Sequence, residues 1–336
     1  MRITPETLLK IARDTVTRRT RNDRDLLAIY LDGSLLDDDP LLGGTTDIDL
    51  VFVHNEAVTV DREIQPLTDE VHLDIAHHAR GIYHHARELR LHPWLGPTVF
   101  RCKILFDPQH FMDYTQASVR SQFNRPDNVL ARARSQADHA REMWLNLHNL
   151  NISAGFEEIS LYLKAVEHAA NAVTSLSGSL LTERRFLMMF PARAAIINHA
   201  GLYAGLLGLL GAPNVNAETL RSWLPAWEST YKAIATAQFP PHLHPARFNY
   251  YRLAFEPILQ GEHPHNILWT LLKTWTRAIA LLPPDHVGRH TLQEALQQLG
   301  LFGTGFSQRV AALDAYLDMV EEMLEDWGRT NGAESR

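Results

Sequence analysis

The chain is poor in cysteine, and that shortage excludes two kinds of stabilised protein. Cys102 is its single cysteine. An intramolecular disulfide and a zinc site built from several cysteines are therefore both excluded. We expect Cys102 to be a half-buried thiol in a reducing compartment.

The chain also lacks a long apolar run. The longest nearly apolar stretch, residues 200–213, has the sequence AGLYAGLLGLLGAP and falls short of the ~20 residues that a membrane span needs. The first twenty residues contain acidic side chains and an early proline, and no apolar segment typical of a signal peptide follows them. We expect a cytoplasmic protein without a membrane partner.

An excess of basic residues is missing as well. The sequence has 32 lysines and arginines against 39 aspartates and glutamates, a formal net charge of −7. A protein that binds the phosphate backbone of nucleic acids usually carries a basic excess, so the balance argues against a nucleic acid partner. It leaves open a nucleotide held through a metal ion.

The 336 residues, 45% of them hydrophobic, suffice for one large domain or two ordinary ones. Residues 1–110 alternate between helix and strand patterns, whereas helical periodicity dominates after them. The sequence therefore predicts an α+β protein, with a small mixed-sheet domain in residues 1–110 and an all-helical domain in residues 111–330. In the first region we expect helices over 4–20 and 80–90 and strands over 26–31, 47–54, 71–76 and 99–106. In the second we expect helices near 109–123, 126–149, 155–176, 190–210, 217–237, 246–280, 291–299 and 306–327.

Polar residues with a specific spacing follow the first predicted strands. The first strand runs into Gly33-Ser34, a turn whose backbone can approach a phosphate closely. Asp47 and Asp49 open the next strand and face the same way, about 6–7 Å apart. Asp74 lies in a third apolar run. Two such carboxylates repel each other unless a cation lies between them, so the three acids predict a site for a hard divalent ion such as Mg²⁺.

These residues resemble the signature of the polymerase-beta-like nucleotidyltransferase superfamily. That signature is an apolar strand, Gly-Ser, a spacer of about ten residues, Asp-x-Asp on a second strand and a third acid on a later strand. The resemblance covers about residues 20–110. The helices that follow are similar in layout to the helical domain of the kanamycin- and streptomycin-type (aminoglycoside) nucleotidyltransferases.

The resemblance implies a reaction and roles for the residues. It implies transfer of a nucleoside monophosphate, AMP from ATP, to a hydroxyl of an antibiotic-like small molecule or a protein, with release of pyrophosphate. Asp47 and Asp49 would hold the Mg²⁺ ions, and Asp74 would hold the second ion or act as the general base. Gly33 and Ser34 would bind the β- and γ-phosphates.

The resemblance also assigns residues of the helical region. Lys164 and Arg185, or Arg184, would contact the triphosphate; the alternative for Lys164 is an ion pair with Glu167 on the same helix. A glutamate of the same helix would be a candidate base, and the spacing does not single one out among Glu157, Glu158 and Glu167. A homodimer is implied as well, because a partner subunit completes the site in kanamycin-type enzymes.

Three other interpretations remain open from the sequence. The histidines at 77–78 and 84–85 are typical of a surface, with zinc as the alternative. Arg134 and His139 match an Arg-x4-His spacing seen in the ribonuclease partners of toxin–antitoxin nucleotidyltransferases. The chain could also bind a nucleotide without catalysis and act as an interaction protein.

Overall fold

The computed structural model describes residues 3–149, 155–236 and 239–333. The chain is α+β and divides into two compact units. The sheet unit comprises the residues up to Asn124 together with Phe239–Pro257, and the helical unit comprises the rest. Residues 111–124 and 239–257, which the sequence analysis placed in the helical region, therefore pack with the sheet.

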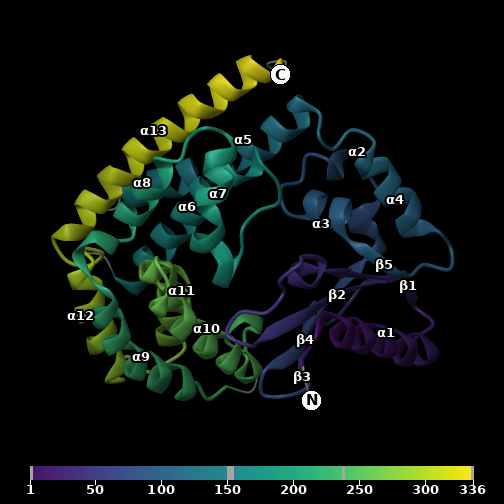
Figure 1. The fold of residues 1–336 in the computed structure, drawn as a ribbon, viewed down its shortest axis with the longest axis horizontal. Helices are drawn as coiled ribbons and strands as arrows, with labels where there is room; N and C mark the ends of the chain where they lie inside the picture. Colours follow the sequence, from purple (N-terminus) through teal and green to yellow (C-terminus); the bar gives the residue numbers. More distant parts are fainter. Residues whose placement is uncertain (1–2, 150–154, 237–238, 334–336) are drawn as a thin grey trace. The chain divides into compact units, whose positions relative to one another are not determined.

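Five strands form one mixed sheet in the sheet unit (Figure 1). They are β1 (Leu26–Asp32), β2 (Thr46–His54), β3 (Arg62–Pro66), β4 (Val71–Ala79) and β5 (Lys103–Phe106), in the order β3-β4-β2-β1-β5. The β2–β4 pair is parallel, and the other pairs are antiparallel. The two strands that carry the predicted acids, β2 and β4, are therefore direct neighbours.

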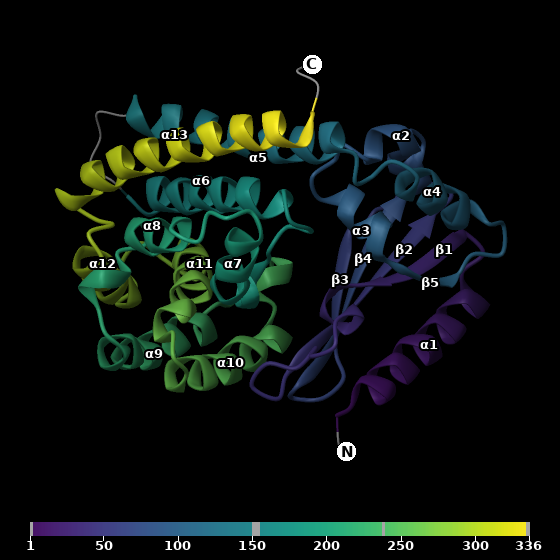
Figure 2. The ribbon, with the colours of Figure 1, turned by 45° about the horizontal axis from the view of Figure 1, so that its top comes forward.

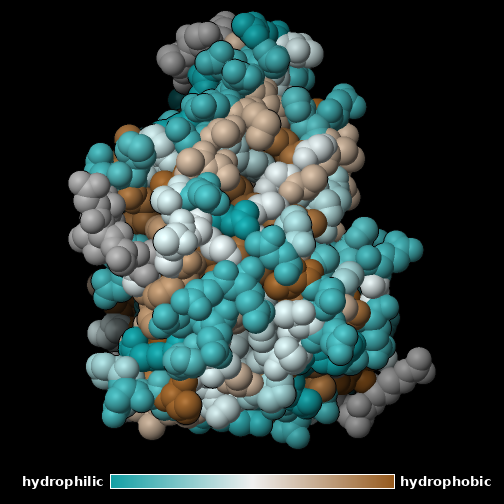
Figure 3. Space-filling model, turned by 90° about the vertical axis from the view of Figure 1, so that its left-hand side faces the viewer, coloured by the Kyte–Doolittle hydropathy of each residue, from teal (hydrophilic) through white to brown (hydrophobic). Residues whose placement is uncertain are grey.

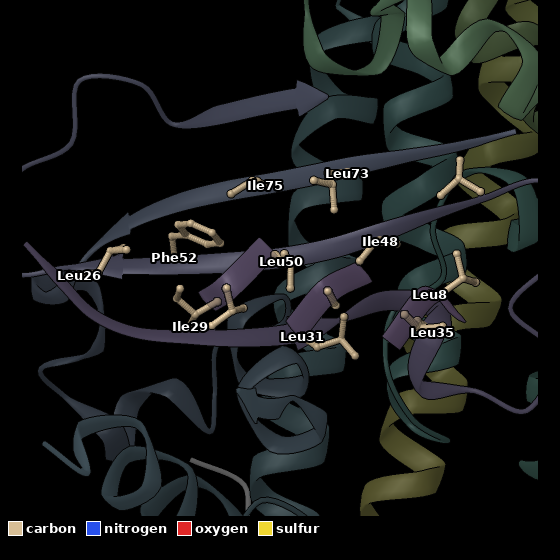
Figure 4. Close-up of a cluster of buried hydrophobic side chains, with 13 residues drawn as sticks. Leu8, Leu26, Ile29, Leu31, Leu35, Ile48, Leu50, Phe52, Leu73 and Ile75 are labelled. Atoms are coloured by element: carbon tan, nitrogen blue, oxygen red, sulfur yellow. The ribbon is translucent and has the colours of Figure 1, made fainter. Parts of the chain in front are cut away.

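Helix α1 (Pro5–Asn22) covers one face of this sheet. The Thr4 side chain accepts a hydrogen bond from the backbone N–H of Thr7, and Pro5 occupies the first helical position, so the helix begins as its sequence predicts. Its apolar side packs on alternate residues of β1, β2 and β4, as the two-residue period of a strand requires (Figure 4). The cluster contains Leu8, Ala12, Val16, Leu26, Ile29, Leu31, Leu35, Ile48, Leu50, Phe52, Val71, Leu73 and Ile75.

The opposite face carries a second core cluster and the predicted acids. Short helices α2 (Ala86–Leu89), α3 (Leu95–Arg101) and α4 (Phe111–Arg120) and the 3-10 turn η2 (Arg80–Tyr83) contribute to this cluster with Val51 and Val53 of β2. Because side chains alternate along β2, Asp47 and Asp49 share this face with Val51 and Val53. The packed half of the strand thus fixes the direction in which the acids point.

The helical unit contains α5 to α9 and α11 to α13. Helix α13 packs along α5 and α6, as Figure 2 shows. The core of the helical unit includes Trp227, Trp269 and Trp275, which are fully buried. The bounds are α5 Pro126–His148, α6 Phe156–Ser175, α7 Phe186–Ile196, α8 Leu202–Leu209, α9 Ala217–Lys232, α11 Ile267–Ala280, α12 Gly288–Gln298 and α13 Gly305–Asn331, while α10 (Phe248–Gln260) begins in the sheet unit.

The surface in Figure 3 is mostly hydrophilic, and hydrophobic residues form small separate patches on it. None of the helices in the described part of the chain has the length and apolar character that crossing a bilayer requires.

Several predicted elements differ from the structure at prolines and glycines. The helix predicted over 246–280 is interrupted between Gln260 and Ile267 by a segment with Gly261 and Pro264, and that predicted over 190–210 is interrupted before Leu202. Only the second half of the predicted strand over 99–106 is a strand, β5. The first half ends helix α3, in which Val99 is buried. Residue 237, the end of another predicted helix, lies outside the described residues.

Candidate active site

The three predicted acids converge on one face of the sheet. Asp49 of β2 and Asp74 of β4 are direct partners in the parallel register, and Asp47 lies two residues before Asp49 on the same face. Carboxylate oxygens of all three residues lie within 4.8 Å of one another. The parallel register therefore produces the cluster that the sequence spacing predicts.

The turn after β1 lies directly against this cluster. The chain leaves β1 through the 3-10 turn η1 (Gly33–Leu36), and Gly33 has φ +74°. A Cβ at residue 33 would overlap the carboxylate of Asp49. Only glycine permits both the left-handed conformation and this approach. The hydroxyls of Ser34 and Thr46 lie 3.4 Å apart at the same turn.

The cluster holds negative charge in a poorly hydrated place. Asp47 is 6% exposed and Asp74 is 1% exposed, while Asp49 is partly exposed. Burial raises the pKa of Asp49 well above its usual value, and the carboxylate of Asp47 raises it further. A cation placed among these oxygens would relieve both effects.

Two arginines already contact Asp74, and the sequence analysis did not identify either. Arg62 of β3 donates from Nε to Oδ1 at 2.5 Å and from Nη2 to Oδ2 at 2.9 Å, a two-point pair. Arg247, from the 3-10 turn η6 (Pro245–Arg247), donates through Nη2 to Oδ2 of Asp74 and lies 3.9 Å from Oδ2 of Asp47. No spacing in the sequence signals them, because Arg62 reaches Asp74 through the pairing of β3 with β4 and Arg247 comes from a segment distant in the chain.

A fourth carboxylate, Asp32, was also missed. It ends β1, is the direct antiparallel partner of Asp49 and contributes to the raised pKa of that residue. Asp32, Asp49 and Asp74 thus form a row across three adjacent strands. An acid directly before Gly33-Ser34 was the available signal.

The donor set fits a divalent metal such as Mg²⁺. All three converging groups offer carboxylate oxygens, the ligands that hard cations prefer. Because Gly33 has no Cβ, the side chain of Asp49 has room to lie in the cluster. A divalent ion held by these residues would neutralise part of the charge of a polyphosphate and orient it beside a hydroxyl nucleophile.

The predicted residues of the helical region lie on α6 and on the 3-10 turn η3 (Glu183–Arg185). Lys164 is exposed on α6, and its predicted contact with phosphate, like that of Arg185, stays a prediction. Glu167 forms an ion pair with Lys273 of α11. The sequence had offered Lys164 as the partner of Glu167 in such a pair. Glu158 accepts a hydrogen bond from the backbone N–H at position 155 (2.7 Å), and Glu157 is exposed.

The histidine-rich segment does not converge as one group. The ring of His77 bonds to that of His54 at 2.9 Å, and His78 bonds to the hydroxyl of Tyr83 at 2.6 Å. His84 and His85 are exposed. The surface interpretation therefore holds for His84 and His85, whereas His77 and His78 are partly buried and hydrogen-bonded to other side chains.

The Arg-x4-His match lies within the long helix α5. Five residues of an α-helix correspond to a rotation of about 140° beyond a full turn, so Arg134 and His139 project in different directions. The His139 ring bonds to the carbonyl of Ser135 at 2.5 Å and stacks on His168. These contacts give the pair no shared site.

Comparison with known proteins leaves the family open. No family model matches the chain, and no curated protein matches it. Among solved structures, the chain is similar to a nucleotidyltransferase-like protein from Exiguobacterium sibiricum 255-15, with 12% identity over 94% of this chain and 91% of that one, at a TM-score of 0.30. A likeness at this TM-score does not establish a shared fold.

Proposed function

We propose that this protein is a Mg²⁺-dependent nucleotidyltransferase that moves a nucleoside monophosphate, AMP from ATP, to a hydroxyl of a small-molecule or protein acceptor. One observation carries the proposal: Asp47, Asp49 and Asp74 converge on adjacent parallel strands, directly beside the Gly33-Ser34 turn. The carboxylates match a divalent cation, and the turn matches the phosphates that such a cation would accompany.

Each residue then has a role in the transfer. The acceptor oxygen forms a bond to the α-phosphorus, the bond from that phosphorus to the oxygen that bridges the α- and β-phosphates breaks, and pyrophosphate leaves. Asp47 and Asp49 would hold the cation that accompanies the polyphosphate, and the hydroxyl of Ser34 holds its outer phosphates. Asp74 would take the proton of the acceptor hydroxyl or would hold a second cation. Bound Mg²⁺ would supply charge neutralisation of the phosphates and a lower pKa for the acceptor hydroxyl.

The test needs no knowledge of the acceptor. Calorimetric titration of the four nucleoside triphosphates, with and without Mg²⁺, should give Mg²⁺-dependent binding of one of them to the wild type. The Asp47→Asn, Asp49→Asn double variant should lose this binding. Asp38→Asn is the matched control, because Asp38 is an exposed aspartate of the same unit. Equal binding by the double variant and the control would rule out the metal assignment.

A non-catalytic nucleotide-binding protein is the second candidate, and the arginine contacts of Asp74 favour it. A carboxylate that two arginines already neutralise does not require a metal. Pyrophosphate release from the bound triphosphate, measured with cell extract as the source of acceptor, separates the two candidates. Release that disappears in Asp49→Asn supports the enzyme, whereas binding without any release supports the second candidate.

A further inference from the structure

Arg247 is the most deeply buried cation at the acidic cluster. It is 5% exposed, and its guanidinium group bridges from Asp74 toward Asp47. Arg62 contacts Asp74 as well, but 42% of the Arg62 side chain is exposed. Arg247 thus occupies the interior of the cluster, and Arg62 occupies its rim.

The segment that carries Arg247 packs tightly against the loop before β2. The carbonyl of Tyr250 accepts a hydrogen bond from the Thr45 hydroxyl at 3.4 Å, and the Tyr250 ring packs edge-on against His72, with 5.2 Å between the ring centroids. A Cβ at Gly43 would overlap the carbonyl of Leu253. Residues 239–257 are therefore anchored to the sheet unit at several points, with Arg247 directed into the cluster.

The guanidinium of Arg247 occupies one of the two oxygens that Asp74 could offer to a metal ion. Oδ2 of Asp74 accepts bonds from both Arg62 and Arg247, so a metal can use this oxygen only after a donor withdraws. A divalent cation beside a buried guanidinium would also meet strong like-charge repulsion. Both effects act against simultaneous occupancy.

We propose that Arg247 is the resident cation of the acidic cluster and that a divalent metal binds Asp47, Asp49 and Asp74 by displacing it. Metal binding then removes the contact of Arg247 with the cluster, one of the contacts that hold residues 239–257, so the arrival of the metal loosens this segment. The inference rests on the metal site of the proposed function and adds a regulatory contact to it.

Binding of Mn²⁺ alone, followed by electron paramagnetic resonance, tests the competition directly. Arg247→Met removes the competing charge and should bind Mn²⁺ at least fivefold more tightly than the wild type. Arg252→Met is the matched control, because Arg252 lies on the same segment with its side chain against Phe248 and Asn249. A change below fivefold in Arg247→Met, or weaker binding, would overturn the proposal.

A second measurement uses the wild type and so covers the case in which Arg247→Met does not fold. Saturating Mn²⁺ should increase hydrogen exchange of the backbone amides in residues 239–257, and Asp49→Asn should show no such increase. Unchanged exchange in the wild type under saturating Mn²⁺ would overturn the displacement.

The two proposals fail in different ways. If the wild type binds Mn²⁺ through Asp49 but Arg247→Met binds it no better, the displacement is wrong and the metal site stands. If neither the wild type nor a folded Arg247→Met variant binds Mn²⁺, both proposals are wrong.

Discussion

Gly33 combines an unusual backbone conformation with a close approach to the acidic cluster. Its φ of +74° disfavours any side chain, and a Cβ would also overlap the Asp49 carboxylate. Gly44 offers a matched control, with φ +73° and open space around a Cβ. A comparison of the two positions therefore separates the conformational cost from the overlap.

Gly33→Ala should lower the free energy of unfolding by more than Gly44→Ala does. The left-handed conformation alone costs about 1–2 kcal/mol in each variant, and the overlap with Asp49 adds to the cost in Gly33→Ala. Urea denaturation measures the stability, and Mn²⁺ titration measures the site. Equal losses in the two variants, with Mn²⁺ binding intact, would show that the close approach has no role.

The residues of the cluster differ in how easily they can be predicted from the sequence. Asp47 and Asp49 lie two positions apart on one strand, so a local rule places them together. Asp74 follows from the apolar run around it. Arg62 and Arg247 follow from no such rule, because their approach to Asp74 depends on the pairing of β3 and on the return of a distant segment.

Helices α9 and α11 are joined in the core by buried indole hydrogen bonds. Trp275 of α11 is fully buried and donates from Nε1 to the hydroxyl of Thr230 of α9 at 3.2 Å. The Thr230 hydroxyl in turn donates to the carbonyl of Ala226 at 2.8 Å. The threonine thus satisfies a polar atom that water does not reach.

Thr230→Val should lower the free energy of unfolding by about 1–3 kcal/mol, the cost of leaving a buried donor without its acceptor. Chemical denaturation measures the loss. Thr230→Ser retains the hydroxyl and should recover most of the difference between the two proteins. If the serine variant is as unstable as the valine variant, the lost methyl packing, and not the hydrogen bond, explains the result.

Strands with a clear apolar pattern are predicted correctly, whereas a strand that depends on its neighbours in the sheet is not. The strands over 26–31, 47–54 and 71–76 are confirmed as parts of β1, β2 and β4. The edge strand β3 has the sequence REIQP, which is largely polar and ends in proline, so it shows no strand alternation. Its partners on β4, and not its own pattern, hold it in the sheet.

Each unit contains a histidine that burial keeps neutral. Burial lowers the pKa of His78, in the sheet unit, to about 4, and Arg62 and His77 lower it further. Burial likewise lowers the pKa of His168, in the helical unit, to about 4; His139, Lys164 and Lys273 act in the same direction, and Glu167 opposes them. An unfolded histidine titrates near pH 6.5.

Stability should therefore fall as the pH is lowered from 6.5 to about 4. In this window the unfolded state binds protons that the folded histidines do not, and the full stabilisation is present only above pH 6.5. His168→Gln should reduce the loss by about 1–3 kcal/mol over the window. Urea denaturation at several pH values measures it, with the exposed His290→Gln as control. A slope in His168→Gln equal to that of the wild type would contradict the prediction.

The division into a sheet region and a helical region is visible in the sequence, but the path of the chain is not. Periodicity changes near residue 110, which is where the last strand ends. Residues 246–257 open a predicted helix that continues to residue 280, and nothing local distinguishes residues 239–257 as part of the sheet unit. Their membership depends on tertiary contacts such as that between Thr45 and Tyr250.

The discontinuous sheet unit has a consequence for synthesis. A ribosome completes Asn124 roughly 130 residues before Pro257, an interval of roughly 7–25 s at ordinary elongation rates. During that interval the strands can pair, but Asp74 still lacks Arg247. A nascent chain would therefore pass through a stage in which Arg62 and dissolved cations are the available counter-ions for its three aspartates. The order of translation alone would thus expose the cluster to metal before Arg247 arrives.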